Sequence, residues 1–289
     1  MFIFLLLLSV RLHPAETGRP SISLGPLINS LIKDYNAIAD ADLPTLKDGQ
    51  LEELAGGANV TVIEKRAGSN APGQQGDRYQ VVAYRLIKRP RTDVWIALRD
   101  PHFAKTGRGT VVRLNEGSSG TVTSFTYLPL PWPMRDRYWV TDTHPAPRVS
   151  ELTAGRVWQI RWALAANGSH LAHDAVDRGL ASGLSEERLS QAIYLPENTG
   201  AWTLFCCAES QTLLVFQSYL DLGGWIPESV SLRSARGQLD DLLLRVAEAS
   251  TRTITHYDAD ARHPVILGGD GLPLAKPLRG RQSCPPPRP

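Results

Sequence analysis

The sequence is short of cysteine, of net charge and of recognisable catalytic motifs. Its 289 residues include three cysteines, and 31 basic residues nearly balance 29 acidic ones, for a formal charge of +2. Three cysteines cannot build the disulfide framework of a small secreted domain, and the adjacency of Cys206 and Cys207 disfavours a bond between those two. The charge lacks the strong lysine and arginine excess of nucleic-acid-binding proteins, so we expect no nucleic-acid partner.

Motifs that hold a nucleotide, a metal ion or a catalytic serine are also absent. The sequence has no G-x-S-x-G elbow, no G-x-x-x-x-G-K-[ST] loop, no G-x-G-x-x-G fingerprint and no H-E-x-x-H helix. His170-x-x-His173-Asp174 carries metal-binding side chains without a further spaced partner, and we interpret it as part of a polar, solvated loop. Cys206 and Cys207 are interpreted as small strand residues. We expect no catalytic residue, no metal and no cofactor, and a protein that is not an enzyme.

Both ends of the chain differ from its body. Residues 2–10 (FIFLLLLSV) are apolar but too few for a membrane-spanning helix, which needs about 20. Their number suits the core of a secretory signal, roughly 7–15 residues, although no lysine or arginine precedes them and no A-x-A site is present. Segment 1–17 is therefore interpreted as an export signal, either cleaved or anchoring. The alternatives are a mis-assigned start codon and a cytoplasmic protein with an apolar N-terminus. The protein is expected to be exported in the first case and cytoplasmic otherwise.

The C-terminal segment 251–289 is rich in proline and basic. It holds seven prolines, and six basic against three acidic residues give it a charge of 6 − 3 = +3, so the rest of the chain is nearly neutral. Proline blocks helices and strand ladders, which predicts a mostly irregular segment. We interpret it as a solvated tail that takes no part in the fold; a tail that binds a partner or an anionic surface is the alternative.

Strand patterns dominate the body, where the 42% apolar content suffices for a core. Runs rich in β-branched and aromatic residues, bounded by turn residues, predict roughly seven antiparallel strands. The eight runs that carry this pattern are Val60–Lys65, Tyr79–Lys88, Thr110–Leu114, Gly120–Leu128, Arg137–Thr143, Val157–Leu164, Trp202–Cys207 and Thr212–Leu220. Within Val157–Leu164, tryptophans alternate with polar residues, which predicts a sheet covered on its aromatic face.

Helical periodicity appears before, between and after these strands. It predicts helices at Leu27–Ile38, from the capping residues Thr92 and Asp93 to about Leu98, and at Pro227–Ala249. Gly49–Leu54 is either a short turn or a short helix. Antiparallel strands joined by short turns, with helices on one face, define an α+β fold rather than βαβ units. A helix laid across a curved sheet leaves an apolar hollow, which is the usual form of a small-molecule site.

Three motifs then point to a family. RTDVWIALRD (Arg91–Asp100), PWPMRDR (Pro131–Arg137) and DLGGWIP (Asp221–Pro227), in this order and spacing, resemble the START (steroidogenic acute regulatory protein-related lipid transfer) domain, particularly its bacterial members. The resemblance implies a helix-grip fold, in which a curved antiparallel sheet wraps around a long C-terminal helix over an internal hydrophobic tunnel. It also implies binding of a lipid or another apolar ligand without catalytic residues, with the terminal helix as a lid.

The resemblance suggests how the chain is divided. We expect an apolar N-terminal segment at 1–17, a helical extension at 18–45, a START-like domain at 46–250 and the proline-rich tail at 251–289. The polar stretch His170–Leu189 departs from the family pattern, which leaves the geometry of the ligand entrance open. Asp136 and Arg137 are expected to form a structural ion pair, and Gly223-Gly224 either eases movement of the lid or forms a tight turn.

Candidate ligand-binding residues are mainly tryptophans. We expect Trp139, Trp158, Trp162, Trp202, Trp225 and Val230 to line the tunnel, although simple core packing is an equal alternative for the tryptophans. Arg161 alternates with the tryptophans of its strand. It is therefore solvent-exposed if their face is the tunnel, and a buried anchor for a ligand head group if the register is opposite.

The expected function is non-enzymatic binding, and transfer, of a lipid or other hydrophobic small molecule by a monomer in transient contact with a membrane. The first alternative is a polyketide cyclase or aromatase on the same broad fold. That reaction needs an ionisable pair inside the tunnel, for which Arg161 with Tyr138 or Tyr194 is the best candidate. The second alternative is a ligand-sensing module whose tail recruits a partner.

Overall fold

The computed structural model describes residues 24–66, 78–99, 109–117, 120–224, 228–253, 266–274 and 284, with the backbone alone at 65–66, 78 and 228–235. The apolar segment 1–17, Trp225 and Pro285–Pro287 lie outside these residues, so the predictions made for them stay predictions. Across the described ranges, we find no helix that is both long enough and apolar enough to cross a bilayer.

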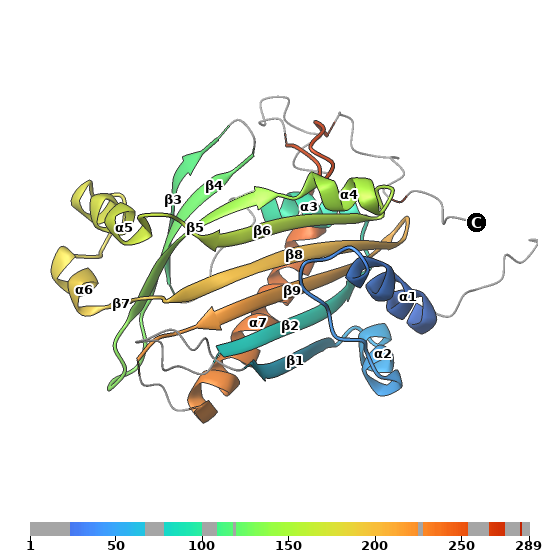
Figure 1. Ribbon diagram of the computed structural model, residues 1–289, viewed down its shortest axis with the longest axis horizontal. Coiled ribbons are helices and arrows are strands. Elements are labelled where there is room, and N and C mark those ends of the chain that lie inside the picture. The colour runs from blue at the N-terminus through green and yellow to red at the C-terminus, as the bar shows by residue number, and fades with distance from the viewer. Residues whose placement is uncertain are drawn as a thin grey trace, which may run out of the picture.

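One open antiparallel sheet organises the described part of the chain (Figure 1). Its nine described strands are β1 (Asn59–Arg66), β2 (Arg78–Ile87), β3 (Thr110–Glu116), β4 (Val122–Leu128), β5 (Arg137–Pro145), β6 (Val157–Leu164), β7 (Ile193–Tyr194), β8 (Glu197–Ala208) and β9 (Gln211–Asp221). They pair in the order β1-β2-β9-β8-β6-β5-β4-β3, and β7 pairs in parallel with β5. The sheet is curved but not closed. The predicted count of roughly seven strands is too low: the eight predicted runs match β1 to β6, β8 and β9, and the two residues of β7 are too few to show a periodicity.

Seven helices accompany the sheet in the described residues. They are α1 (Leu24–Asn36), α2 (Asp48–Ala55), α3 (Arg91–Arg99), α4 (Pro147–Leu152), α5 (Gly168–Asp177), α6 (Glu186–Gln191) and α7 (Glu228–Ser250). The long terminal helix and the short helix between the second and third strands are confirmed. The antiparallel sheet with α7 across one face also confirms the predicted α+β helix-grip architecture.

The polar stretch His170–Leu189 is not a solvated loop, and this prediction was wrong. It contributes to α5 and α6, which pack beside β5 and β4. Ala172, Ala175 and Val176 are buried there because they follow one another at helical spacing on one side of α5. Their small size leaves the polar residues to dominate the sequence pattern, which explains why the helix was missed.

Helices cover the central strands on both faces. Figure 1 shows α1 and α2 in front of the sheet and α7 crossing behind it. On the α1 face, Ile28, Ile32 and Tyr35 pack against Tyr84 and Phe205. Tyr35 is also tied to the sheet by a hydrogen bond, because its hydroxyl accepts from the Gln159 amide at 2.6 Å. The helical extension predicted at 18–45 therefore contributes α1 to the core.

On the opposite α7 face, the core joins α3, α7 and the strands between them. Leu239, Leu243 and Val246 of α7 are buried against a cluster that includes Trp95 and Trp158. We call this side of the sheet the α7 face.

The described C-terminal segment 266–274 packs onto this same core. It is a turn closed by a bridge between Leu267 and Pro273, and the Trp95 indole donates to the Leu267 carbonyl at 2.8 Å. Ile266 and Leu274 lie against the cluster of the α7 face. The segment is irregular, as predicted, but the interpretation as a solvated tail outside the fold is wrong for these residues.

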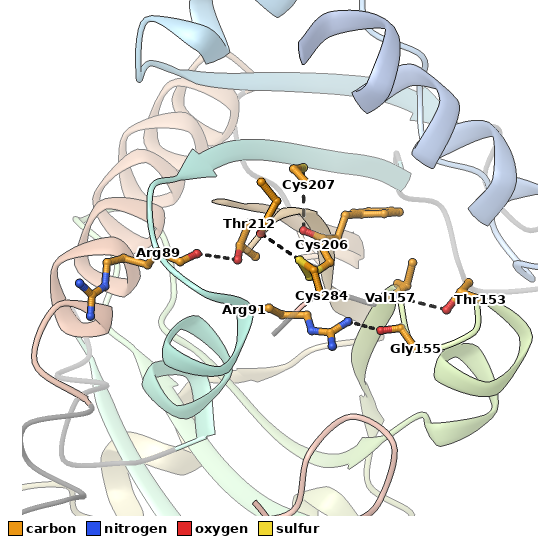
Figure 2. The surroundings of a disulfide bond; sticks show 11 residues. Arg89, Arg91, Thr153, Gly155, Val157, Cys206, Cys207, Thr212 and Cys284 are labelled. Atoms are coloured by element: carbon orange, nitrogen blue, oxygen red, sulfur yellow. Dashed lines mark hydrogen bonds between the residues drawn. A yellow bond between two sulfur atoms is a disulfide. The ribbon is translucent and has the colours of Figure 1, made fainter. Parts of the chain in front are cut away.

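A disulfide bond joins the C-terminal region to the sheet. Cys206 of β8 is bonded to Cys284, with their Cα atoms 5.4 Å apart and a sequence separation of 78 (Figure 2). That Cα separation is within the ordinary range for disulfides. Cys206 is therefore more than a small strand residue, while Cys207 is free. The pairing was not predictable from spacing, because it brings together distant parts of the chain.

Asp93 is not the predicted helix cap but lies inside the first turn of α3, which begins at Arg91. Its carboxylate is fully buried and accepts from Arg89 Nη2 at 2.6 Å. Burial raises the pKa of Asp93 to about 6, against the opposing effect of Arg89.

We expect this carboxyl to make stability depend on pH. Its folded-state pKa lies above the unfolded value of about 3.9, so the folded protein loses stability as the pH rises through about 4 to 6, by up to about 3 kcal/mol. Urea unfolding at pH 4.5 and pH 7 measures this loss. The Asp93→Asn variant should lose much less over the same interval, and equal losses in the two proteins would contradict the assignment.

Candidate ligand-binding face

Three aromatic side chains form a half-buried cluster on the α7 face. Trp162 of β6 stacks on Phe216 of β9 with ring centroids 5.3 Å apart, and Trp202 of β8 meets Phe216 edge-on at 4.8 Å. The strand pairing places them side by side, because Trp202 lies opposite Phe216 and Trp162 lies opposite Gly200. All three rings keep some exposure to solvent. The cluster is therefore an apolar surface that is only partly covered.

Asn198 and Gly200 of β8 set the position of Trp162. The indole Nε1 donates to Asn198 Oδ1 at 2.9 Å, which holds one end of the ring. Gly200 has no side chain, and a Cβ there would overlap the Trp162 ring and the Gln217 carbonyl. The ring therefore lies directly over the glycine. Aromatic rings placed over a strand glycine in this way replace the packing that the glycine lacks.

Trp158 lies on the same face of β6 but at its buried end. Its ring meets Trp95 edge-on at 5.2 Å, and the guanidinium of Arg91 lies 4.0 Å from the ring centre. Gly269 of the C-terminal segment covers another part of the ring. The structure thus places Trp158 in the core, whereas Trp162 and Trp202 remain half-buried.

The remaining predicted residues fall into different surroundings. Trp139 of β5 is half-buried and shares the α7 face, because its neighbours Tyr138 and Val140 point to the α5 side. Arg161 lies on the α1 face, where it donates to Asp40 at 2.6 Å and to Gln159 at 2.6 Å. The structure therefore separates Arg161 from the tryptophans. Trp225 and the side chain of Val230 lie outside the described residues, and ligand binding by any of these residues stays a prediction.

Buried Arg137 holds the turn that precedes α7. Its Nε donates to the Leu222 carbonyl at 2.5 Å and its Nη2 to the Gly223 carbonyl at 2.6 Å. Burial lowers the pKa of Arg137 from its ordinary value, and the nearby Arg135 acts in the same direction. Gly223 and Gly224 have φ values of +62° and +63°, which favour glycine. Of the two interpretations of this pair, these values support the tight turn.

The predicted ion pair between Asp136 and Arg137 was wrong, because the two side chains are held by different partners. The Asp136 carboxylate instead accepts from the Tyr127 hydroxyl and, at 2.9 Å, from the backbone of Leu130. Arg137 is left to satisfy the backbone carbonyls before α7. Sequence alone gave no signal for this role, since the acceptors are main-chain atoms 85 and 86 residues away.

The ionisable groups considered for a cyclase are not on the α7 face. Tyr138 and Tyr194 meet edge-on at 5.2 Å on the α5 side, and the Tyr138 hydroxyl is 3.0 Å from Ser169 Oγ. Burial raises the pKa of Tyr194. Arg161 belongs to the α1 face. In the ranges that the structure covers, no three histidine, cysteine, aspartate or glutamate residues are grouped so as to hold a metal ion.

Sequence reasoning missed Phe216 of the cluster and the two residues that set the position of Trp162. Phe216 ends a continuous apolar run, Leu213–Phe216, and only the strand pairing shows on which face it lies. Gly200 was visible as a glycine within a strand pattern, which often marks a close approach. Asn198 carried no signal, because its role depends on the strand pairing that brings it next to Trp162.

Comparisons with known proteins give structural matches alone. No protein-family model matches the sequence, and no curated protein matches it. Human StAR-related lipid transfer protein 5 is 11% identical, covering 80% of this chain and 98% of its own, with a TM-score of 0.47. The STAR-related lipid transfer protein of Xanthomonas axonopodis is 16% identical, covering 66% and 98%, with a TM-score of 0.44. Structural neighbours of the chain are START domains.

The START domains are not alone among these neighbours. The Zhui aromatase/cyclase from a Streptomyces species is 14% identical, covering 61% of this chain and 95% of its own, with a TM-score of 0.40. Matches at this level concern the fold alone. The START-like helix-grip description therefore rests on the chain's own sheet and α7.

We expect Gly200→Ala to disturb the cluster. The added methyl group collides with the Trp162 ring and a backbone carbonyl, and overpacking of this kind costs about 1–3 kcal/mol. The loss is measured by urea unfolding, together with a shift of tryptophan emission in the folded protein. Gly237→Ala is the matched control, because Gly237 is an exposed helical residue with nothing within 4 Å of its added methyl group. Equal stabilities of the two variants would contradict the packing of Trp162 over Gly200.

Proposed function

We propose that this protein binds a lipid or another hydrophobic small molecule, without catalysis, against the Trp162–Trp202–Phe216 cluster of the α7 face. The observation that supports this most is the partial burial of three aromatic rings in mutual contact on the helix-covered side of an open sheet. A fully packed core would bury them. Rings that are apolar, fixed in place and still partly exposed are suited to cover a flat or flexible apolar ligand.

The covering helix has the properties of a lid. Its described part buries Leu239, Leu243 and Val246 through ordinary apolar contacts, each worth about 1.5–3 kcal/mol relative to exposure. Contacts of this size allow α7 to open locally without unfolding the sheet. The turn at Leu222 and Gly223, shortly before α7, is held by hydrogen bonds from Arg137 to two carbonyls.

Binding without catalysis is favoured over a cyclase reaction. General acid–base chemistry requires ionisable groups within hydrogen-bonding reach of the ligand. The groups considered for that role, Arg161, Tyr138 and Tyr194, are directed to the α1 and α5 sides of the sheet. Asn198, a polar residue beside the cluster, is already hydrogen-bonded to Trp162.

We expect Trp162→Ala to weaken ligand binding. Uptake of NBD-labelled cholesterol and NBD-labelled phosphatidylcholine from vesicles, followed by fluorescence, should fall at least tenfold for whichever probe the wild type binds. Arg161→Gln changes the neighbouring residue of the same strand, which faces α1, and should leave uptake within about twofold of the wild type. Equal losses in both variants would contradict binding on the α7 face. The proposal would also be contradicted if no apolar ligand were found either in organic extracts of gently purified protein or in titrations with these probes.

The connection between β4 and β5 is the part of the surface we propose for membrane contact. Trp132 is 92% exposed and lies between Pro131 and Pro133, which are also exposed. Arg137, a few residues on, reaches the turn before α7, so this connection and the start of the lid are at the same end of the sheet. Tryptophan prefers the interface between water and lipid.

We expect Trp132→Ser to slow transfer of a bound lipid between vesicles by at least threefold, with unchanged affinity for that lipid. Leu152→Ser is the control, since Leu152 is an exposed apolar residue in α4, beyond the opposite end of β5. Transfer rates of labelled lipid from donor to acceptor vesicles measure the effect. Unchanged transfer by the Trp132 variant would rule out this connection as the contact.

A further inference from the structure

The C-terminal segment 266–274 covers the Trp158 end of the α7 face. The indole of Trp95 donates to the Leu267 carbonyl at 2.8 Å, and Gly268 and Gly269 lie against the Trp158 ring. A Cβ on Gly269 would overlap the Trp158 side chain, so the backbone itself rests on the ring. Asp270 adds a negative charge near the buried Arg91, where burial lowers the pKa of Arg91 and Asp270 opposes that effect. The segment thus closes one end of the proposed ligand-binding face.

Noncovalent contacts hold this cover only modestly. The segment contains Gly268, Gly269 and Gly271, and ordering glycine costs more backbone entropy than ordering other residues. Its apolar side chains in contact with the core are Ile266 and Leu274. The stability of the closed position of segment 266–274 therefore depends on how firmly the two ends of the segment are held.

The Cys206–Cys284 bond supplies a covalent hold ten residues beyond the cover. Cys206 is buried on β8, in the strand row that also carries Leu204 and Trp202 on the α7 face. Figure 2 shows the bond beside Arg91, whose guanidinium donates to the Gly155 carbonyl, and beside Thr212, which donates to the Arg89 carbonyl at 2.9 Å. The bond is therefore next to the residues that support Trp158.

Cys207 does not compete for this bond. It packs with the α1 face, on the other side of β8, and burial raises the pKa of its thiol to about 12. A thiol in that state supplies almost no thiolate, which is the species that attacks a disulfide. The bond is thus protected from exchange within the chain and is broken by an external reductant.

We propose that the Cys206–Cys284 disulfide is a redox latch that keeps segment 266–274 closed over the Trp158 end of the ligand-binding face. A dithiol reductant attacks one sulfur, forms a mixed disulfide and leaves as its own cyclic disulfide. The dithiol thereby supplies the two electrons and two protons that convert the bond into the thiols of Cys206 and Cys284. The released segment exposes Trp158 and opens the ligand-binding face at that end. Closure requires an oxidising compartment, which also favours the exported alternative for this protein.

The latch itself is tested without any ligand. Denatured, unreduced protein should contain one titratable thiol, and three would overturn the proposal. Hydrogen exchange of peptides covering 266–274 should become at least tenfold faster in the wild type with dithiothreitol, and in Cys284→Ser without it. Cys207→Ser is the control and should exchange like the oxidised wild type. Gly269→Val should also speed exchange with the disulfide intact, because its side chain meets Trp158. Exchange that is unchanged by reduction of the wild type would overturn the latch.

The effect on ligand passage rests on the proposed function and is measured separately. Association of NBD-labelled cholesterol, or of NBD-labelled phosphatidylcholine if that is the probe bound, should be at least threefold faster in the reduced wild type and in Cys284→Ser than in the oxidised wild type. Faster exchange of 266–274 with unchanged probe association would overturn control of access by the latch. Failure of every form to bind either probe would contradict the proposed function, while hydrogen exchange would still decide the latch.

Discussion

The central strands must be covered on both faces, and the rest of the structure depends on this constraint. In β9, Thr212, Leu213, Leu214 and Val215 are all buried, so this part of the strand is shielded from water on both faces. Strands buried on both sides are unusual in antiparallel sheets, in which one face is commonly solvated. The chain satisfies the constraint with α1 and α2 on one side and with α3, α7 and segment 266–274 on the other. The proposed binding face is the part of the second side that this covering leaves incomplete.

The two ends of the α7 face are built differently. At one end Trp158 is enclosed by Trp95, Arg91 and Gly269, and it serves the core. At the other end Trp162 stacks on Phe216 and lies over Gly200, Trp202 meets Phe216 edge-on, and all three rings remain half-buried. The same residue type therefore plays two roles within one strand, four positions apart. What distinguishes the roles is the number of elements that reach each ring.

Local periodicity accounted for most of the strands, for α1 and for α7, because each has an apolar side that repeats every two or about 3.6 residues. It failed for α5, where small alanine and valine residues form the buried side and polar residues dominate the sequence. The face occupied by Arg161 depended on strand register, which alternation alone leaves open, and the structure places it beside Asp40. Contacts between Arg137 and Gly223, or Cys206 and Cys284, could not be predicted, since they join distant segments through a backbone carbonyl or a single sulfur pair.

The pairing of β2 with β9 has a consequence for how the chain folds. It places Tyr79 opposite Leu220, so two early strands have no partner on that side until more than a hundred further residues have been synthesised. The core of the α7 face is complete only after Ile266 and Leu274 have been synthesised. Such long-range pairing slows folding and leaves strand edges unpaired while synthesis proceeds. During that interval β1 and β2 offer an open edge to other chains, so the growing polypeptide is expected to be most prone to aggregation before β9 emerges.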